Sequence, residues 1–257
     1  AVSRRSSSAS RRRSSSASGR VAGLVAGIFI GVGCAGADRA RVDILAASSY
    51  TDVAEPLEAL LEKELGLDVE FSFGSSGSFL EQIRQGAPAS VVITADSSTM
   101  QRISDEGLVD SVVSIATNEL VIVAADTAVG RGIESVADLG SSGVIVVLCA
   151  SSAPCGAATD AMLGGIGSDV DPASREPNVR ATLTKVRLGE ADAAIVYLTD
   201  ALASPELRPV AIAQDDNVEV TSRAAAVVGR SDAMRVLEAL TEPAAMSVLA
   251  QAGFGSP

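Results

Sequence analysis

Short apolar segments alternate with segments of helical periodicity along most of this chain, and the alternation restricts the fold more than any other feature. Residues 42–47 fit a buried strand, and leucines at 57–65 then recur at helical spacing until Gly66 ends the run. Because strands that alternate with helices build an α/β fold with mostly parallel sheets, that fold class is expected here, in two blocks that divide near Asn118. The expected strands cover 42–47, 68–73, 89–94, 120–124, 144–148, 193–197, 207–213 and 224–228.

The composition excludes several chemistries. The 257 residues include no histidine and only two lysines, Lys63 and Lys185, which removes a Ser-His-Asp triad, histidine acid–base catalysis and histidine metal ligands. From Cys34 onward there are 14 basic and 32 acidic side chains, a formal charge of −18. This charge argues against a nucleic-acid partner. A bound anion would have to be held by neutral donors and local dipoles.

The first 40 residues have the composition of a targeting segment. Residues 1–20 are rich in Ser and Arg and lack acidic residues, residues 21–32 are apolar, and small residues surround Cys34. Twelve apolar residues are too few for a comfortable membrane span. Val32-Gly33-Cys34 resembles the end of a bacterial lipobox, which implies a signal peptide at 1–33, lipidation of the Cys34 thiol and a linker over 34–41. The alternative is a chance cysteine beside an ordinary cleavage site. Paired arginines suggest twin-arginine export, although their flanking residues fit that signal poorly.

A turn rich in glycine and serine, Gly74-Ser75-Ser76-Gly77, joins an apolar run to a helix-like segment at 79–84. Glycines let backbone N–H groups approach a ligand, and a helix N-terminus offers unpaired donors with a partial positive charge. The turn therefore predicts an anion site. The alternative is an ordinary helix cap, because Ser78 and Glu81 fit a capping box. Thr51 or Asp52 can likewise cap the helix that follows them, which contains the leucines at 57–65.

Small polar residues also follow other expected strands. Ser49 follows the first strand, a loop from Cys149 to Cys155 follows the strand at 144–148, and Tyr197 ends the strand at 193–197. Hydroxyl and N–H donors without a neighbouring base suit binding better than catalysis. The two cysteines are six residues apart and can pair in an exported protein, or can remain two buried free thiols.

A catalytic alternative is a secreted hydrolase with Ser76 as its nucleophile. The turn around Ser76 does not match Gly-x-Ser-x-Gly, and Lys63 or Lys185 would have to act as the base. Both lysines lie in expected helices at positions typical of a surface, so the residues favour a protein that is not an enzyme.

Seven short segments form a set: AASSYT at 46–51, FGSSG at 73–77, QIRQGAPA at 82–89, TAD at 94–96, PCG at 154–156, NVR at 178–180 and IVYLTDA at 195–201. In this order and spacing, the chain from about residue 42 to its end resembles the periplasmic molybdate-binding proteins of ABC importers. The resemblance implies a type II periplasmic-binding-protein fold with a hinge between two lobes, each a mostly parallel sheet flanked by helices. The first lobe would comprise 42–117 and 222–257, and the second lobe 118–221.

The resemblance also implies a site that holds a tetrahedral oxyanion between the lobes. Ser49 and Ser76 would supply hydroxyl and backbone donors, Cys155 and Val179 backbone N–H groups, and Tyr197 its phenol O–H. Molybdenum would be present only within the oxyanion, and no cofactor or catalytic residue is implied. A disulfide between Cys149 and Cys155 would brace the anion loop of the second lobe. The chain departs from the family at Ser90 and at Ser222-Arg223, which affects the hinge more than the site.

The resemblance further implies a molecular role. The chain would capture molybdate or tungstate and deliver it to an ABC transporter permease and its ATPase, as a monomer. It would be exported, either anchored to the membrane only by a lipid on Cys34 or free in the periplasm. The alternative is a binding protein for another tetrahedral oxyanion such as sulfate or phosphate. Such proteins often add an ionic or acidic partner in the pocket, which the mapped positions lack.

Overall fold

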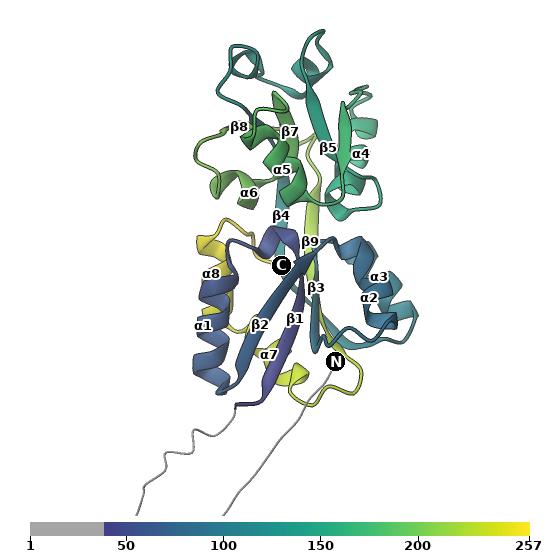
Figure 1. Cartoon of the computed structure of the whole chain (residues 1–257), viewed down its shortest axis with the longest axis vertical. Helices are drawn as coiled ribbons and strands as arrows, with labels where there is room; N and C mark the ends of the chain where they lie inside the picture. The colour runs from purple at the N-terminus through teal and green to yellow at the C-terminus, as the bar shows by residue number, and fades with distance from the viewer. Residues whose placement is uncertain (1–38) are drawn as a thin grey trace, which may run out of the picture. The chain divides into compact units, whose positions relative to one another are not determined.

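Two long strands connect the two halves of the molecule. β4 (Val109–Ala124) and β9 (Glu219–Val227) run antiparallel through the centre of Figure 1. β4 pairs with β9 as far as Glu119, and from Leu120 onward it pairs with β7 (Ala193–Tyr197) and β8 (Arg208–Ala211). The structure, a computed structural model, describes residues 39–257. Its strands form one connected sheet in the order β2-β1-β3-β9-β4-β7-β5-β6, with β8 also beside β4.

The first lobe is a sheet covered by helices on both faces. Its strands are β1 (Arg41–Ala47), β2 (Asp68–Gly74) and β3 (Val91–Thr94), which pair in parallel, followed by β9 and the first part of β4. One face carries α1 (Ala54–Leu65), α7 (Ala233–Thr241) and α8 (Pro243–Gln251), and the other carries α2 (Phe79–Arg84) and α3 (Ser97–Asp105) (Figure 1). Because successive strand residues point to opposite faces, Leu45 packs in the smaller cluster with α2 and α3, while Ile44 and Ala46 pack in the larger one.

The second lobe repeats this plan on the other part of β4. β5 (Val146–Cys149) pairs in parallel with β6 (Ser174–Glu176) and with β7, and β4 runs antiparallel to β7 and β8. Its helices are α4 (Pro154–Gly165), α5 (Val179–Arg187) and α6 (Leu198–Leu202), with two 3-10 turns, η3 (Gly130–Gly132) and η4 (Val136–Gly140). The large hydrophobic cluster continues from the first lobe into this one.

The structure confirms the α/β fold and adds to the expected strands. The outer strands pair in parallel as expected, and β4 and β9 run antiparallel to their neighbours, so the sheet is mixed. The first part of β4 was not expected, because register shifts and the left-handed Ser111 (φ 52°) interrupt its alternation of buried and exposed residues. β6 was also missed, since its three residues lie in a polar segment.

The expectations for the N-terminal region fall outside the described residues. These are the signal peptide at 1–33, the lipidated Cys34 and most of the linker at 34–41; of the linker, Arg41 already belongs to β1. Within residues 39–257, no helix has both the length and the apolar character that a membrane-spanning helix needs.

Candidate functional site

All five residues that the sequence predicted for a binding site surround one small cavity between the lobes. The first lobe lines it with Ala47, Ser48, Ser49, Gly74, Ser75, Ser76 and Ala95, and the second lobe lines it with Ala153, Pro154, Cys155, Asn178, Val179 and Tyr197. The cavity has a volume of about 10 Å³, close to the minimum that one ordered water needs. Any occupant must therefore be compact, or the lobes must separate to admit it.

The first lobe contributes two 3-10 turns at the ends of adjacent strands. η1 (Ser48–Tyr50) follows β1 directly, and η2 (Ser76–Ser78) follows β2. Ser49 and Ser76 are buried in these turns. The ring of Tyr50, next to Ser49, packs against Phe254 with the ring centroids 4.8 Å apart. The C-terminal tail thus supports the turn that holds Ser49.

The hydroxyl of Ser76 is oriented by its own lobe. Its Oγ accepts a hydrogen bond from the backbone N–H of Ala95, at 3.1 Å. A serine hydroxyl has one proton to donate and two lone pairs that accept. Since the bond to Ala95 uses a lone pair, the proton of Ser76 stays available for an acceptor in the cavity.

The helix caps expected in the first lobe are wrong. The Ser78 hydroxyl donates to the Ser75 carbonyl and accepts from the Gln82 amide, each at 2.8 Å, and makes no capping bond to the helix backbone. Ser78 already has helical dihedrals at the end of η2, so its side chain cannot reach over the first turn. In the same way α1 begins after Val53 without a side-chain cap. The Asp52 carboxylate instead bonds to Arg180.

The second lobe directs the N-termini of two helices at the cavity. Cys155 is the second residue of α4, and Val179 is the first residue of α5. The side chain of Asn178 caps α5 by accepting from the N–H of Ala181 at 3.0 Å. This bond uses a later amide, so the N–H of Val179 is left among the unpaired donors that every helix N-terminus has. Both helix dipoles favour negative charge in the cavity.

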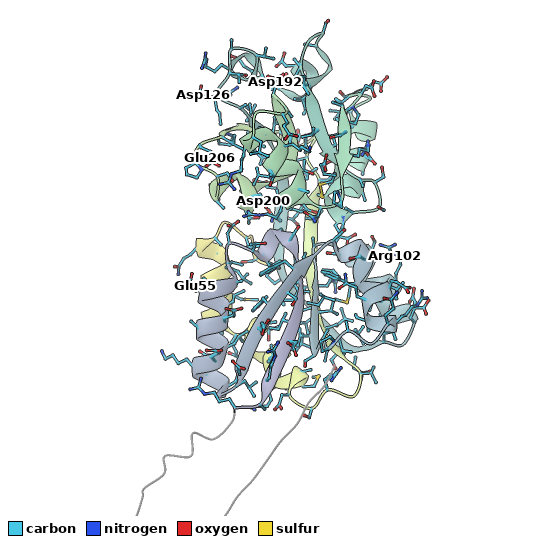
Figure 2. All side chains as sticks on the ribbon, viewed as in Figure 1. Glu55, Arg102, Asp126, Asp192, Asp200 and Glu206 are labelled. Atoms are coloured by element: carbon cyan, nitrogen blue, oxygen red, sulfur yellow. A yellow bond between two sulfur atoms is a disulfide. The ribbon has the colours of Figure 1, made fainter. Side chains whose placement is uncertain are left out.

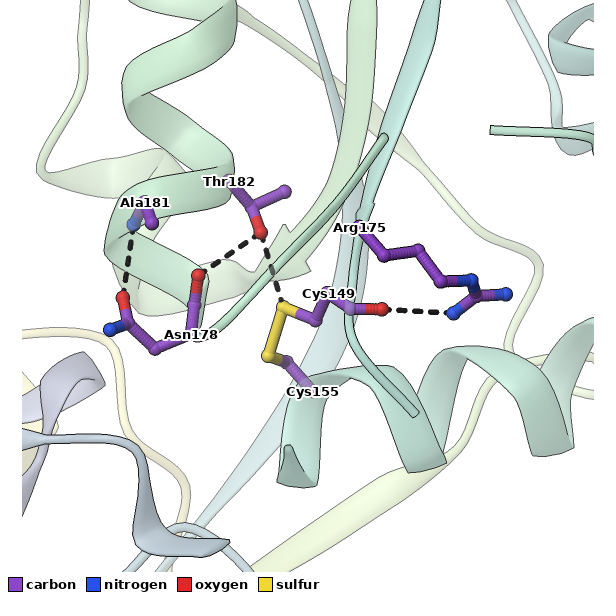
Figure 3. The surroundings of a disulfide bond; sticks show 6 residues. All are labelled: Cys149, Cys155, Arg175, Asn178, Ala181 and Thr182. Carbon is purple, nitrogen blue, oxygen red and sulfur yellow. Dashed lines mark hydrogen bonds between the residues drawn. A yellow bond between two sulfur atoms is a disulfide. The ribbon is translucent and has the colours of Figure 1, made fainter. Parts of the chain in front are cut away.

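A disulfide joins Cys149, at the end of β5, to Cys155 at the start of α4 (Figure 3). Around it, Arg175 donates to the Cys149 carbonyl at 2.9 Å, and the Thr182 hydroxyl donates to the Asn178 carbonyl at 3.1 Å. The loop turns so tightly that a Cβ on Gly156 would lie 2.0 Å from the Ala150 carbonyl oxygen. Glycine is therefore required where the loop enters α4.

Tyr197 places a neutral hydroxyl donor at the cavity, and no neighbouring group accepts a hydrogen bond from it. Its side chain is buried, and its hydroxyl has no hydrogen-bond partner among residues 39–257. Burial raises the pKa of Tyr197 well above its ordinary value, and the charges of Asp96 and Asp200 raise it further. The phenol therefore keeps its proton at neutral pH, and an acceptor in the cavity would satisfy it.

The cavity combines strong donors with an absence of charge. None of its lining residues is ionisable at neutral pH, so its electrostatic character comes from hydroxyls, N–H groups and helix ends. Among the residues that the structure describes, no group of three or more Cys, Asp or Glu could hold a metal cation. The arrangement suits a small anion, held without the cost of burying a cation beside it.

Two residues with a role at the cavity were not predicted for it. Asn178 caps α5, and Ala95 positions the Ser76 hydroxyl through its N–H. A signal for Asn178 was present, because asparagine before a run of helical periodicity is a strong N-cap. Ala95 had no such signal, since only its backbone takes part.

Two α/β lobes that meet at a cavity lined with donors define a solute-binding protein. The family described as "Bacterial extracellular solute-binding protein" matches residues 42–255. The chain belongs to this family, and within it to the group that includes the molybdate-binding proteins ModA.

Three similar proteins illustrate the range of sequence identity. The molybdate-binding protein ModA of Mycobacterium tuberculosis is 35% identical over 216 residues, covering 82% of this chain and 81% of the relative. A putative ABC transporter substrate-binding lipoprotein of Bacillus subtilis, YvgL, is 28% identical over 227 residues, with 84% and 86% covered. The solved structure of the periplasmic molybdate-binding protein of Azotobacter vinelandii shares the fold with a TM-score of 0.71 at 20% identity, covering 84% of this chain and 99% of that one.

Proposed function

We propose that this protein captures molybdate or tungstate between its lobes and delivers it to the permease and ATPase of an ABC importer. The observation that carries the proposal is the convergence of Ser49, Ser76, Cys155, Val179 and Tyr197 on one cavity without charged residues. A relative that is 35% identical and is named a molybdate-binding protein supports the choice of anion.

The donors account for affinity and for selectivity. Hydrogen bonds to an anion contribute roughly 1.5–3 kcal/mol each, so several together support micromolar or tighter binding. Because Ser76 and Tyr197 each have a proton to donate, an anion that carries its own O–H would place one donor against another. Fully deprotonated molybdate presents only acceptors to these donors, whereas hydrogen phosphate presents one O–H that cannot accept.

Calorimetric titration of the chain from residue 39 onward with molybdate, tungstate, sulfate and phosphate tests the proposal. We expect tight binding of molybdate and tungstate at one site, and binding of phosphate that is weaker by orders of magnitude because it carries a proton. Sulfate carries none, so its weaker binding is expected only from the relative named a molybdate-binding protein. Tight binding of sulfate or phosphate without binding of molybdate would assign the protein to the alternative class of oxyanion carriers.

A hydrolytic role for Ser76 finds no support at the site. Its hydroxyl oxygen accepts a hydrogen bond from the Ala95 N–H, which is a donor and cannot act as a base. Lys185, one of the two lysines, pairs with Glu190 on the surface of the second lobe. A serine-reactive phosphonate should therefore leave the protein unlabelled.

The proposal extends to export and anchoring. Lipidation of Cys34 would hold the protein, as a monomer, at the outer face of the cell membrane, and the Bacillus subtilis relative described as a lipoprotein supports this. Expression of the full chain with Cys34→Ser should release the protein from the membrane fraction. Equal membrane association of the variant and the wild type would reject lipidation of Cys34 as the anchor, and a wild type that is itself absent from the membrane fraction would make the free periplasmic form the better proposal.

A further inference from the structure

One ion pair connects the two lobes among residues 39–257, and it lies beside the cavity. Arg180 of the second lobe donates to Asp52 of the first lobe through both terminal nitrogens, with Nη1–Oδ2 at 2.5 Å and Nη2–Oδ1 at 3.2 Å. The other salt bridges of the described residues each join two residues of the same lobe. A two-point contact of this kind fixes orientation as well as distance.

The two partners belong to the segments that carry two predicted ligand residues. Asp52 comes three residues after Ser49, just beyond η1, and Arg180 directly follows Val179 at the start of α5. Neither Asp52 nor Arg180 lines the cavity. Their contact therefore sets the separation of the Ser49 and Val179 segments without touching an occupant.

A buried carboxylate keeps Arg180 in place from within the second lobe. The Asp200 side chain is fully buried, and neither of its oxygens has a hydrogen-bond partner among the described residues. The nearest cation is Arg180, with Nη1 3.8 Å from Asp200 Oδ1. Figure 2 shows Asp200 at the level where the two lobes meet. Whenever Asp200 is ionised, its buried charge is costly without a counter-charge, which gives Arg180 a reason to stay there when the lobes are apart.

Asp52 has no such constraint. Its side chain is 40% exposed even with the lobes together, against 25% for Arg180. When the lobes separate, Asp52 can return to water while Arg180 keeps Asp200 as its neighbour. The pair between the lobes is therefore made on closing and broken on opening, at little cost to either lobe alone.

We propose that Arg180 is a latch, a positioning residue whose bond to Asp52 stabilises the closed lobes and so slows release of the bound anion. This inference rests on the proposed function, in which the closed cavity holds an oxyanion.

Asp52→Asn is the direct test, because it removes the charge, keeps the shape and leaves Arg180 beside Asp200. Asp126→Asn is the matched control: Asp126 pairs with Arg131 inside the second lobe, at the end remote from the first lobe (Figure 2). We expect Asp52→Asn to weaken molybdate binding about three- to tenfold, the range for a partly exposed two-point pair. The loss should appear in the dissociation rate in stopped-flow measurements, with the association rate unchanged.

Two further readouts separate a latch from a merely structural role. Salt weakens exposed ion pairs, so the dissociation rate of the wild type should rise between 0.02 and 0.5 M NaCl. The rise should be about equal to the ratio of the dissociation rates of Asp52→Asn and the wild type at low salt. The dissociation rate of Asp52→Asn should not change with salt. The melting temperatures of the ligand-free variants should agree. Equal affinity and equal dissociation rates for Asp52→Asn and Asp126→Asn would overturn the latch.

The test also distinguishes failure of the latch from failure of the proposed function. If the wild type binds none of the four oxyanions, the proposed function is wrong, and small-angle X-ray scattering of the ligand-free proteins then decides the latch. A larger radius of gyration for Asp52→Asn than for Asp126→Asn at low salt would support it. Equal radii would reject it.

Discussion

Replacing Gly77 by alanine perturbs the closed state while leaving the first lobe itself unstrained. Gly77 lies in η2, and a Cβ added there would be 2.5 Å from the carbonyl oxygen of Ser152 in the second lobe. Ordinary contact begins at 3.4 Å, so the overlap is 0.9 Å. Within the first lobe, the closest atom to that Cβ is the Ser75 hydroxyl oxygen at 3.8 Å, which is ordinary contact. The new methyl group therefore conflicts only with the opposite lobe.

The overlap converts into a loss of affinity. If the lobes part by about 0.9 Å at this point, a hydrogen bond of about 2.9 Å across the cavity stretches beyond the range in which hydrogen bonds are effective. Losing one charge-assisted bond costs roughly 1.5–3 kcal/mol, or about 10- to 150-fold in the dissociation constant. The backbone carbonyl of Ser152 cannot rotate away as a flexible side chain could.

Titration calorimetry measures the affinity for molybdate, and thermal unfolding without molybdate measures the stability of the ligand-free protein. Gly164→Ala is the control, because Gly164 is also in a helical segment and has open space where its Cβ would lie. We expect Gly77→Ala to bind molybdate at least tenfold more weakly while its ligand-free melting temperature does not fall, and Gly164→Ala to bind as the wild type does. Wild-type affinity in Gly77→Ala would refute the argument that the ligand requires this degree of closure.

Three further predictions concern other parts of the site. Tyr197→Phe should leave the ligand-free protein as stable as the wild type in thermal unfolding, since the lost hydroxyl has no partner there, yet weaken molybdate binding by about 1–3 kcal/mol; a loss of stability without loss of affinity would contradict its role. Burial raises the pKa of Asp200 from 3.8 to about 7; the positive charge of Arg180 lowers this pKa, and the negative charge of Asp52 raises it. The folded state therefore holds the proton of the Asp200 carboxyl more tightly than the unfolded state does. The stability that this proton provides is present in full below pH 3.8 and is lost as the pH rises through 7. Denaturant unfolding of Asp200→Asn at pH 5 and pH 8 should show a smaller decline than the wild type, and an unchanged decline would reject this account. Replacing Cys149 and Cys155 together by serine should lower the free energy of unfolding by about 2 kcal/mol and weaken molybdate binding, and an unchanged dissociation constant would show that the bridge does not shape the anion loop.

The fold could be predicted well where neighbours in the chain determine local structure. The expected strand at 42–47 became β1, and the leucine pattern became α1. The prediction failed where tertiary pairing decides the conformation. The first part of β4 has an irregular pattern and is a strand because β9 lies beside it, and β6 exists only as a partner of β5.

The candidate site shows the same division. The resemblance located Ser49, Ser76, Cys155, Val179 and Tyr197, and the folded chain brings all five to one cavity. Their binding of an anion stays a prediction. The two misassigned caps have different causes: the Ser78 hydroxyl bonds to Ser75 and Gln82 close by in the chain, whereas the Asp52 carboxylate bonds to Arg180, far away in the sequence.

By itself, the sequence determined the α/β class, the absence of histidine chemistry and the positions of small polar residues at strand ends, because these depend on composition and on residues close together in the chain. Only the tertiary structure decided which of those residues share a cavity, that the Ser76 hydroxyl takes its orientation from Ala95, and that Asp52 meets Arg180, 128 residues away. The physical reason is that contacts between the lobes depend on how the two lobes meet across β4 and β9, and no local periodicity in the chain records that geometry.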